Sequence, residues 1–182
     1  MSDPLQGITF HVVHPGLMPY LIALYKKEQK IGISDPGVMD WRLKRQFSKY
    51  YPKDRYQVIG AYHLGRIIGF VAWHDEPMLN PYENEPVIPT SSGRDAVRWH
   101  DHLIVGTLYR CRGVGTRLME EFISHADSPR IRNSVWEEWL IDFYGGFGFK
   151  LVTTGIAQNK LRYWILERTN IDARMELNGK SH

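Results

Sequence analysis

Apolar and polar residues alternate along the chain in a pattern that predicts a mixed α/β protein. Short runs rich in β-branched and aromatic residues are typical of strands, and proline, glycine and polar residues separate them. Two of these runs surround Leu64 and Gly65, which predicts a hairpin. The predicted strands are Ile8–Val13, Tyr56–His63, Arg66–His74, Val97–Val105, Ile131–Trp136, Phe149–Thr153 and Leu161–Glu167.

Helical spacing of apolar residues predicts four helices between these strands. The first runs from Leu17 to Gln29, and the second runs from Ser34 to about Tyr50 because serine caps a helix and proline is tolerated in its first turn. The third follows a glycine-rich loop and ends near residue 126, and the fourth covers residues 137–144. The apolar face of the third helix is formed by Val114, Leu118, Met119 and Phe122.

Composition narrows the picture further. The 182 residues suit one domain, and a net charge of +3 is too small to predict nucleic-acid binding by itself. The single cysteine cannot form an internal disulfide, so we expect a reducing compartment. No secretion signal or membrane-spanning stretch is visible, and we therefore expect a cytoplasmic protein.

The most informative segment joins the strand Val97–Val105 to the third helix. Its loop carries Arg110, Arg112, Gly113 and Gly115. Glycines let the backbone approach a phosphate, and the N–H groups at a helix start point toward it. The spacing Arg-x-x-Gly-x-Gly differs from those of dinucleotide-binding folds and P-loops. The alternative is a plain strand-to-helix turn whose glycines allow tight packing.

Two motifs resemble those of the GNAT superfamily of acetyl-CoA-dependent N-acetyltransferases. The segment from Arg110 to Gly115 matches the family's acyl-CoA motif, with Val105 and Tyr109 in register as its lead-in. The aromatic segment Phe143–Phe149 matches the second motif. The resemblance implies one GNAT-like domain over residues 1–182, with a polar tail from about 170. It also implies a mixed, largely antiparallel sheet that splays between strands four and five and is flanked by about four helices.

The resemblance implies that acetyl-CoA, or another acyl-CoA, is the acyl donor. The backbone of the strand end would bind the pantetheine arm, and the loop would bind the pyrophosphate. The expected binding residues are Leu103, Ile104, Val105, Arg110, Cys111, Arg112, Gly113, Val114, Gly115 and Thr116. Cys111 itself is interpreted as a small filler rather than a nucleophile, since the family's usual residue there is small.

By the same resemblance, Tyr144 donates a proton to the departing thiolate; the alternative is a core tyrosine. The family often has an asparagine seven residues earlier, where this chain has Glu137.

The residue that takes the proton of the amine is sought on the strand Val97–Val105. For this base we rank Asp101 first and His102 second, because Asp101 shares its strand face with Leu103 and Val105 if the strand is regular. A bulge would exchange the two faces.

Other interpretations concern metals, partners and one long loop. His100 and His102 share a strand face, but no further ligands lie nearby, so no metal is expected. The loop Asp75–Asp95 is either a lid with carboxylates over the acceptor amine or a solvated insertion.

The expected function is transfer of an acetyl group to a primary amine of a small molecule or a protein. A catalytically silent acyl-CoA-binding module and an acetyltransferase of aminoacyl-tRNA are the alternatives, although the charge argues against nucleic acid. No membrane partner is expected, and a homodimer is left open.

Overall fold

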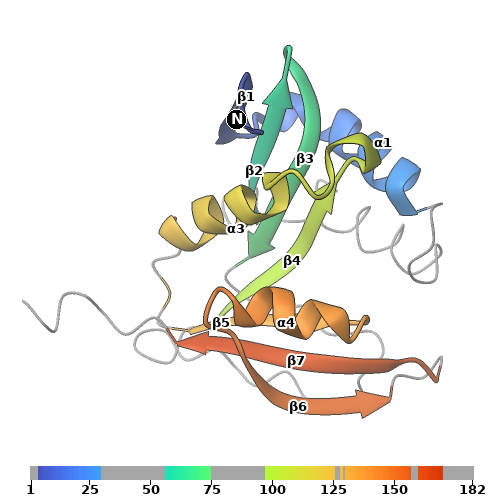
Figure 1. Cartoon of the computed structure of the whole chain (residues 1–182), viewed down its shortest axis with the longest axis vertical. Coiled ribbons are helices and arrows are strands. Elements are labelled where there is room, and N and C mark those ends of the chain that lie inside the picture. The colour runs from blue at the N-terminus through green and yellow to red at the C-terminus, as the bar shows by residue number, and fades with distance from the viewer. Residues whose placement is uncertain are drawn as a thin grey trace, which may run out of the picture. The chain divides into compact units, whose positions relative to one another are not determined.

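The computed structural model describes residues 4–29, 56–74, 97–125, 128, 130–156 and 160–169. The predicted helix at 34–50, the loop at 75–95 and the tail from 170 lie outside the described residues. The elements, labelled as in Figure 1, are β1 (Ile8–Val12), η1 (Pro15–Leu17), α1 (Met18–Gln29), β2 (Tyr56–His63), β3 (Arg66–His74), β4 (Val97–Val105), η2 (Thr107–Tyr109), α3 (Val114–Ser124), β5 (Arg130–Val135), α4 (Trp139–Gly145), β6 (Lys150–Ile156) and β7 (Arg162–Thr169).

The strands form one sheet in the order β1-β2-β3-β4-β5-β7-β6. The pairs β1–β2, β2–β3, β5–β7 and β6–β7 are antiparallel, whereas β4 and β5 are parallel. The β4–β5 register runs from Val97↔Arg130 to His100↔Asn133, and the last five residues of β4 lie beyond it. The prediction of a mixed, largely antiparallel sheet is therefore confirmed.

Two compact units can be distinguished in the chain. The first comprises Met1–His74 and Asp101–His125, and the second comprises Asp75–His100 and Ala126–His182. Strand β4 contributes its first residues to the second unit and its last residues to the first. The organisation of residues 1–182 as one domain stays a prediction.

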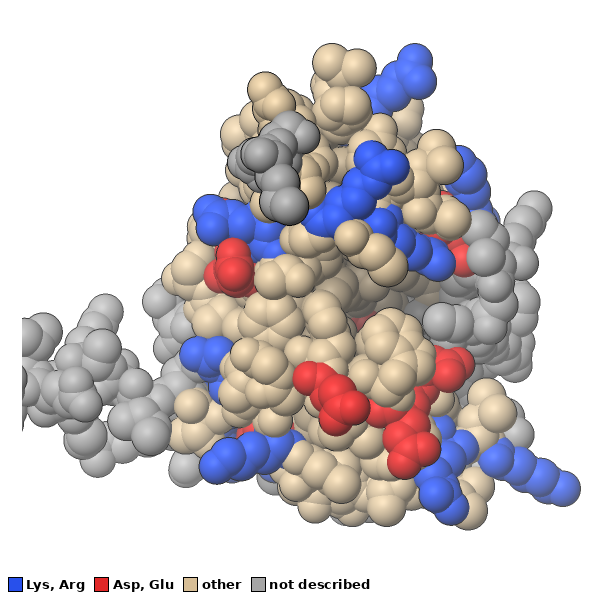
Figure 2. Space-filling view, in the orientation of Figure 1, with Lys and Arg blue, Asp and Glu red and all other residues tan. Residues whose placement is uncertain are grey.

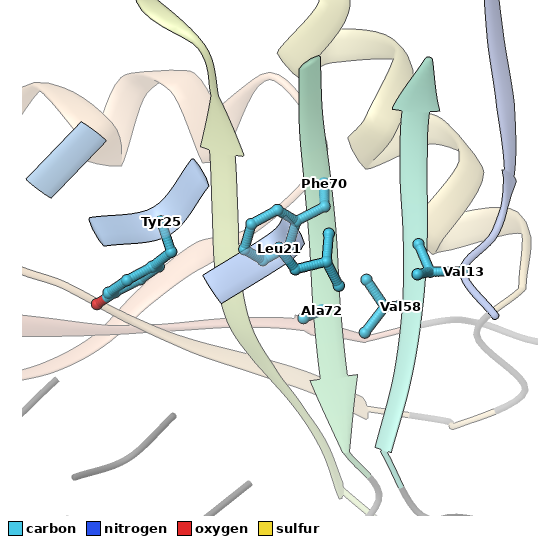
Figure 3. Packing of buried hydrophobic residues seen from close by; sticks show 6 residues of the cluster. All are labelled: Val13, Leu21, Tyr25, Val58, Phe70 and Ala72. Atoms are coloured by element: carbon cyan, nitrogen blue, oxygen red, sulfur yellow. The ribbon is translucent and has the colours of Figure 1, made fainter. Parts of the chain in front are cut away.

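In the first unit, helices pack on both faces of β2 and β3. A core of Val13, Leu21, Tyr25, Val58, Phe70 and Ala72 joins α1 to one face (Figure 3). Side chains alternate along a strand, so Val71 and Trp73 belong to the other face, where Trp73 meets Phe122 of α3 with ring centroids 5.0 Å apart. The buried residues of α3 are Val114, Leu118, Met119 and Phe122, which confirms the predicted apolar face.

Strands β3 and β4 approach each other closely at Gly69. A Cβ placed on Gly69 would lie 2.8 Å from the Ile104 carbonyl oxygen, so only glycine fits there without a shift of the backbone. The adjacent hydrogen bond from the Gly106 N–H to the Ile68 carbonyl is 2.8 Å long. These contacts fix the end of β4, from which the glycine-rich loop departs.

In the second unit, β5 and β7 carry the buried positions. Ile131, Asn133 and Val135 face inward on β5, and Tyr163 and Ile165 of β7 pack with Trp99 and Trp136. Arg132 of β5 and Glu167 of β7 form an ion pair of 2.6 Å. Acidic side chains gather over α4 in Figure 2, where Asp142 lies in the helix and two glutamates precede it.

Element boundaries differ from the prediction where local hydrogen bonds decide them. The first helix begins with the turn Pro15–Leu17, closed by a 2.9 Å bond from the Leu17 N–H to the His14 carbonyl, and α1 follows. Strand β6 extends to Ile156 because it pairs with β7 along its length, although its side chains are mostly exposed and give no apolar signal there.

Among the described residues, no helix is both long enough and apolar enough to span a membrane.

Candidate functional site

The segment between β4 and α3 adopts a tight, defined conformation. After β4, the turn η2 is closed by a 2.8 Å bond from the Tyr109 N–H to the Gly106 carbonyl. Cys111 and Gly113 then take left-handed conformations, with φ of 56° and 82°, and α3 begins at Val114. A left-handed φ is costly for any residue except glycine, which explains why small residues suit position 111.

This loop presents a row of backbone donors. The N–H groups of residues 111–116 have no hydrogen-bond partner among the described residues, and no side chain caps α3. The first amide of this region to be bonded is that of Arg117, which donates to the Gly113 carbonyl at 2.9 Å. Unpaired N–H groups at a helix start carry partial positive charge, so this row favours an anion such as a phosphate.

The two predicted arginines occupy different positions. The Arg110 guanidinium donates to Glu28 Oε2 at 2.7 Å and to the Val105 carbonyl at 3.0 Å, so it ties the loop to α1 and to the end of β4. Arg112 is exposed and has no hydrogen-bond or ion-pair partner among the described residues. Lys and Arg side chains gather over η2 and the start of α3 in Figure 2. Of the two predicted arginines, Arg112 is therefore the one whose guanidinium is available to an anion at this loop.

Two further residues support the loop. Glu28 also accepts a 2.7 Å hydrogen bond from the Thr107 hydroxyl, and its side chain is only 3% exposed. His63 of β2 lies 3.0 Å from the Tyr109 hydroxyl through its Nδ1. Sequence reasoning missed both Glu28 and His63. A glutamate at a helix end carries no sign that it will be buried or which distant residue it will meet.

The end of β4 leaves some backbone groups directed away from β3. The Ile104 carbonyl faces Gly69 of β3. Backbone groups of successive residues point to opposite edges of a strand, so those of Leu103 and Val105 point to the other edge. The Val105 carbonyl there is taken by Arg110. This edge is where the resemblance predicts the pantetheine arm.

The two candidate bases lie on opposite faces of β4. From Arg98 to Leu103 the side chains alternate between buried and partly exposed, as in a regular strand, and Asp101 is partly exposed. His102 is buried, and its ring meets that of Tyr25 of α1 with centroids 5.3 Å apart. The face of Leu103 and Val105 lies against Gly115 at the start of α3. The assignment of Asp101 as the base stays a prediction.

Tyr144 lies at the buried side of α4 in the second unit. Its ring contacts those of His100, Phe143 and Phe149, with centroid distances of 5.5, 5.1 and 5.6 Å. Burial raises the pKa of the phenol far above its ordinary value of 10.0, and a side-chain hydrogen bond with Asn133 acts in the opposite direction. The hydroxyl is therefore protonated throughout the neutral range, and the same shift makes it a weaker acid than a solvent-exposed phenol.

Asn133 is a third polar residue that sequence reasoning missed. It is 3% exposed and opposite His100 in the β4–β5 register. Its Nδ2 meets no acceptor at good hydrogen-bond geometry among the described residues. The sequence did carry a sign of it, because Asn133 occupies an inward position of β5 between Ile131 and Val135.

Within the described ranges, no group of three or more His, Cys, Asp or Glu side chains is arranged to hold a metal ion.

Comparison with known proteins gives the family of this chain. The sequence model of the acetyltransferase (GNAT) family matches residues 21–149, which is more than half of the chain. The protein therefore belongs to the GNAT family of acetyltransferases, and acetyl-CoA-dependent acyl transfer is the activity that the family supports. No curated protein matches the sequence.

Solved structures share the fold at low sequence identity. The PaiA N-acetyltransferase from Thermoplasma acidophilum, in complex with coenzyme A, is 16% identical with a TM-score of 0.62, covering 93% of this chain and 100% of that one. Arabidopsis thaliana NAA60, in complex with a bisubstrate analogue, is 15% identical with a TM-score of 0.62, covering 90% and 99%. The ribosomal-protein-alanine N-acetyltransferase from Brucella melitensis is 14% identical with a TM-score of 0.61, covering 89% and 99%.

Proposed function

We propose that this protein is an N-acetyltransferase that transfers an acetyl group from acetyl-CoA to a primary amine by direct attack in a ternary complex. The observation that carries the proposal is the row of unpaired N–H groups at residues 111–116, within the segment that carries the family's acyl-CoA motif. Such a row matches the charge and geometry of a pyrophosphate.

The first unit supplies the proposed cofactor contacts. The N–H groups of residues 111–116 bind the pyrophosphate, and Arg112 adds charge from its side chain. Arg110 acts through the loop, because its guanidinium is bound to Glu28 and Val105. The backbone at Leu103 and Val105 binds the pantetheine arm in the manner of an added strand.

Two residues carry the proposed proton transfers. The amine nitrogen forms a bond to the thioester carbonyl carbon, and the carbon–sulfur bond breaks. Asp101 accepts the proton that the amine loses, directly or through water, or holds the ammonium in place. Tyr144 gives its phenolic proton to the departing sulfur, and burial keeps that proton on the phenol at neutral pH.

The acceptor is an amine of a small molecule or of a protein. Among the structural neighbours, the enzyme from Brucella melitensis is named for the alanine of a ribosomal protein, which supports a protein acceptor as one of the two candidates. A panel of amines, followed by release of coenzyme A, separates an active enzyme from a silent acyl-CoA-binding module. Inclusion of aminoacyl-tRNA in the panel tests the nucleic-acid alternative. A cytoplasmic location stays an expectation, and the question of a homodimer stays open.

The single cysteine provides a test that needs no acceptor. Cys111 is exposed and lies within the proposed pyrophosphate site. Acetyl-CoA at saturating concentration should slow alkylation of Cys111 by iodoacetamide about tenfold or more, because a bound pyrophosphate covers the thiol. An unchanged alkylation rate at millimolar acetyl-CoA would remove the central claim.

Gly113→Val is the matched control for this measurement. The left-handed φ of 82° is strained for valine, so the variant should lose the N–H geometry while keeping the core of the unit. Its Cys111 should still react, but without protection by acetyl-CoA. The same variant should also lose the rise in melting temperature that acetyl-CoA gives to the wild-type protein.

A further inference from the structure

We propose that Glu28 is a positioning residue, which holds the acyl-CoA loop in its binding conformation from the end of helix α1. This inference rests on the proposed function, since it assigns how the loop is prepared for acetyl-CoA. Glu28 lies one residue before the end of α1 and far from the loop in sequence.

One carboxylate oxygen of Glu28 joins both ends of the turn η2. Oε2 accepts a 2.7 Å hydrogen bond from the Thr107 hydroxyl, at the first residue of η2. It accepts another 2.7 Å bond from Arg110 Nη2, directly after η2. Through Nε, the same guanidinium holds the Val105 carbonyl at the end of β4. Helix α1, the end of β4 and the turn are thereby linked through one carboxylate.

The loop has few other means to hold its shape. The backbone donors of residues 111–116 have no partner among the described residues, and Cys111 takes a left-handed conformation that disfavours side chains. In the part of the chain that the structure describes, a further side-chain anchor is the contact between His63 and Tyr109. A loop without its anchors must be ordered when acetyl-CoA binds, and that ordering reduces the affinity.

Burial distinguishes this ion pair from a surface pair. The Glu28 side chain is 3% exposed, whereas that of Arg110 is 44% exposed. Loss of the carboxylate therefore lets Arg110 turn to water, and the loop loses its tie to α1. A competing interpretation makes Arg110 a phosphate ligand that Glu28 partly neutralises. The two interpretations predict opposite signs for the same substitution.

The test measures the affinity of acetyl-CoA for the full-length chain by calorimetry. Glu28→Gln removes the charge and keeps the size, and it should weaken acetyl-CoA binding about tenfold. Thr107→Val removes the other donor and should weaken binding about threefold. The double variant should bind no more weakly than Glu28→Gln alone, because both changes break the same tie. Glu120→Gln, an exposed glutamate paired with Arg117 on α3, is the matched control and should bind as the wild type does.

Kinetics separate positioning from a general loss of structure. With an active acceptor, Glu28→Gln should raise the KM for acetyl-CoA about tenfold while kcat at saturation stays within about twofold. If Glu28→Gln fails to fold, as judged by its melting curve, the Thr107→Val result decides alone. Unchanged or tighter binding by the folded variant overturns the inference. If the wild-type protein itself does not bind acetyl-CoA, the proposed function fails and this inference fails with it.

Discussion

The rings of His100 and Tyr144 meet edge to face in the second unit, with their centroids 5.5 Å apart. Together with Phe143 and Phe149, His100 encloses the aromatic ring of Tyr144, while the hydroxyl is shared with Asn133. Packing against these three rings thus holds the Tyr144 ring in place, whereas the hydroxyl interacts with Asn133 and takes no part in that packing. This separation allows the hydroxyl to be tested without disturbing the ring.

Tyr144→Phe should lower turnover about 10²–10⁴-fold, the usual contribution of a general acid. The affinity for acetyl-CoA should change little, because the hydroxyl acts on charge that develops only as the sulfur departs. Steady-state kinetics and calorimetry on the same preparation give both quantities. Turnover close to that of the wild type, with chemistry rate-limiting, would make Tyr144 a packing residue.

The pH dependence of stability should report the buried phenol. The folded-state pKa of Tyr144 lies above its unfolded value near 10.0, so the neutral phenol stabilises the folded protein below pH 10. That stability is lost as the pH rises above 10 toward the folded-state pKa. The wild-type protein should therefore lose up to about 1.4 kcal/mol more per pH unit than Tyr144→Phe in this range. Parallel denaturation curves at pH 8 and pH 11 measure the difference, and equal losses would refute it.

Asn133 and Tyr144 should be energetically coupled. Asn133→Leu leaves the buried hydroxyl without its partner, and Tyr144→Phe leaves the amide without its partner, so each single change should cost about 1–3 kcal/mol. The double variant should cost less than the sum by about 1 kcal/mol or more, as urea denaturation can measure. Ser134→Ala, at the next position on β5 and on the opposite face, should be additive with Tyr144→Phe. Additivity in both pairs would show that the two side chains do not interact.

Arg112 of the loop and Arg117 of α3 should respond differently to charge removal. Arg112→Gln should raise the KM for acetyl-CoA about threefold to tenfold at low salt, and the difference should shrink at high salt because exposed charges are screened. Arg117→Gln is the comparison, because its guanidinium already pairs with Glu120 at 3.3 Å and Glu121 at 2.6 Å. Equal effects of the two substitutions would mean that only the general positive field of this surface matters.

Substitutions of Asp101 and His102 should affect different properties, turnover for Asp101 and the melting temperature for His102. Asp101→Asn should depress turnover most severely at low pH, where the acceptor amine is mostly protonated. His102→Gln should lower the melting temperature, since its ring packs against Tyr25 in the core of the first unit. Rate profiles against pH and melting curves for both variants test this. A larger kinetic effect from His102→Gln would identify the histidine as the base.

The sequence pattern predicted the structural features that depend on residues close together in the sequence. The spacing of Val114, Leu118, Met119 and Phe122 predicted the buried face of α3. The local pattern gave only a mixed α/β class, and the largely antiparallel sheet was predicted through the resemblance to the GNAT superfamily. The glycine spacing also predicted a loop with free backbone donors. Glu28 was not predictable in this way, because its partners lie 79 and 82 residues later and only the fold brings them together. Asn133 was readable as a polar residue at an inward strand position, but its partner on α4 was not.

Because β3 and β4 approach closely at Gly69, a substitution at this position should impair activity although Gly69 takes no part in the reaction. Gly69 offers no side chain to any substrate, and its strand carries none of the proposed ligands. Yet a single methyl group there would meet the carbonyl of Ile104 and displace the end of the strand from which the loop departs. A random mutagenesis screen for loss of activity should therefore identify Gly69 as well as the residues that take part in the reaction. Its recovery would reveal how tightly the backbone behind the site is fitted, and nothing about the reaction itself.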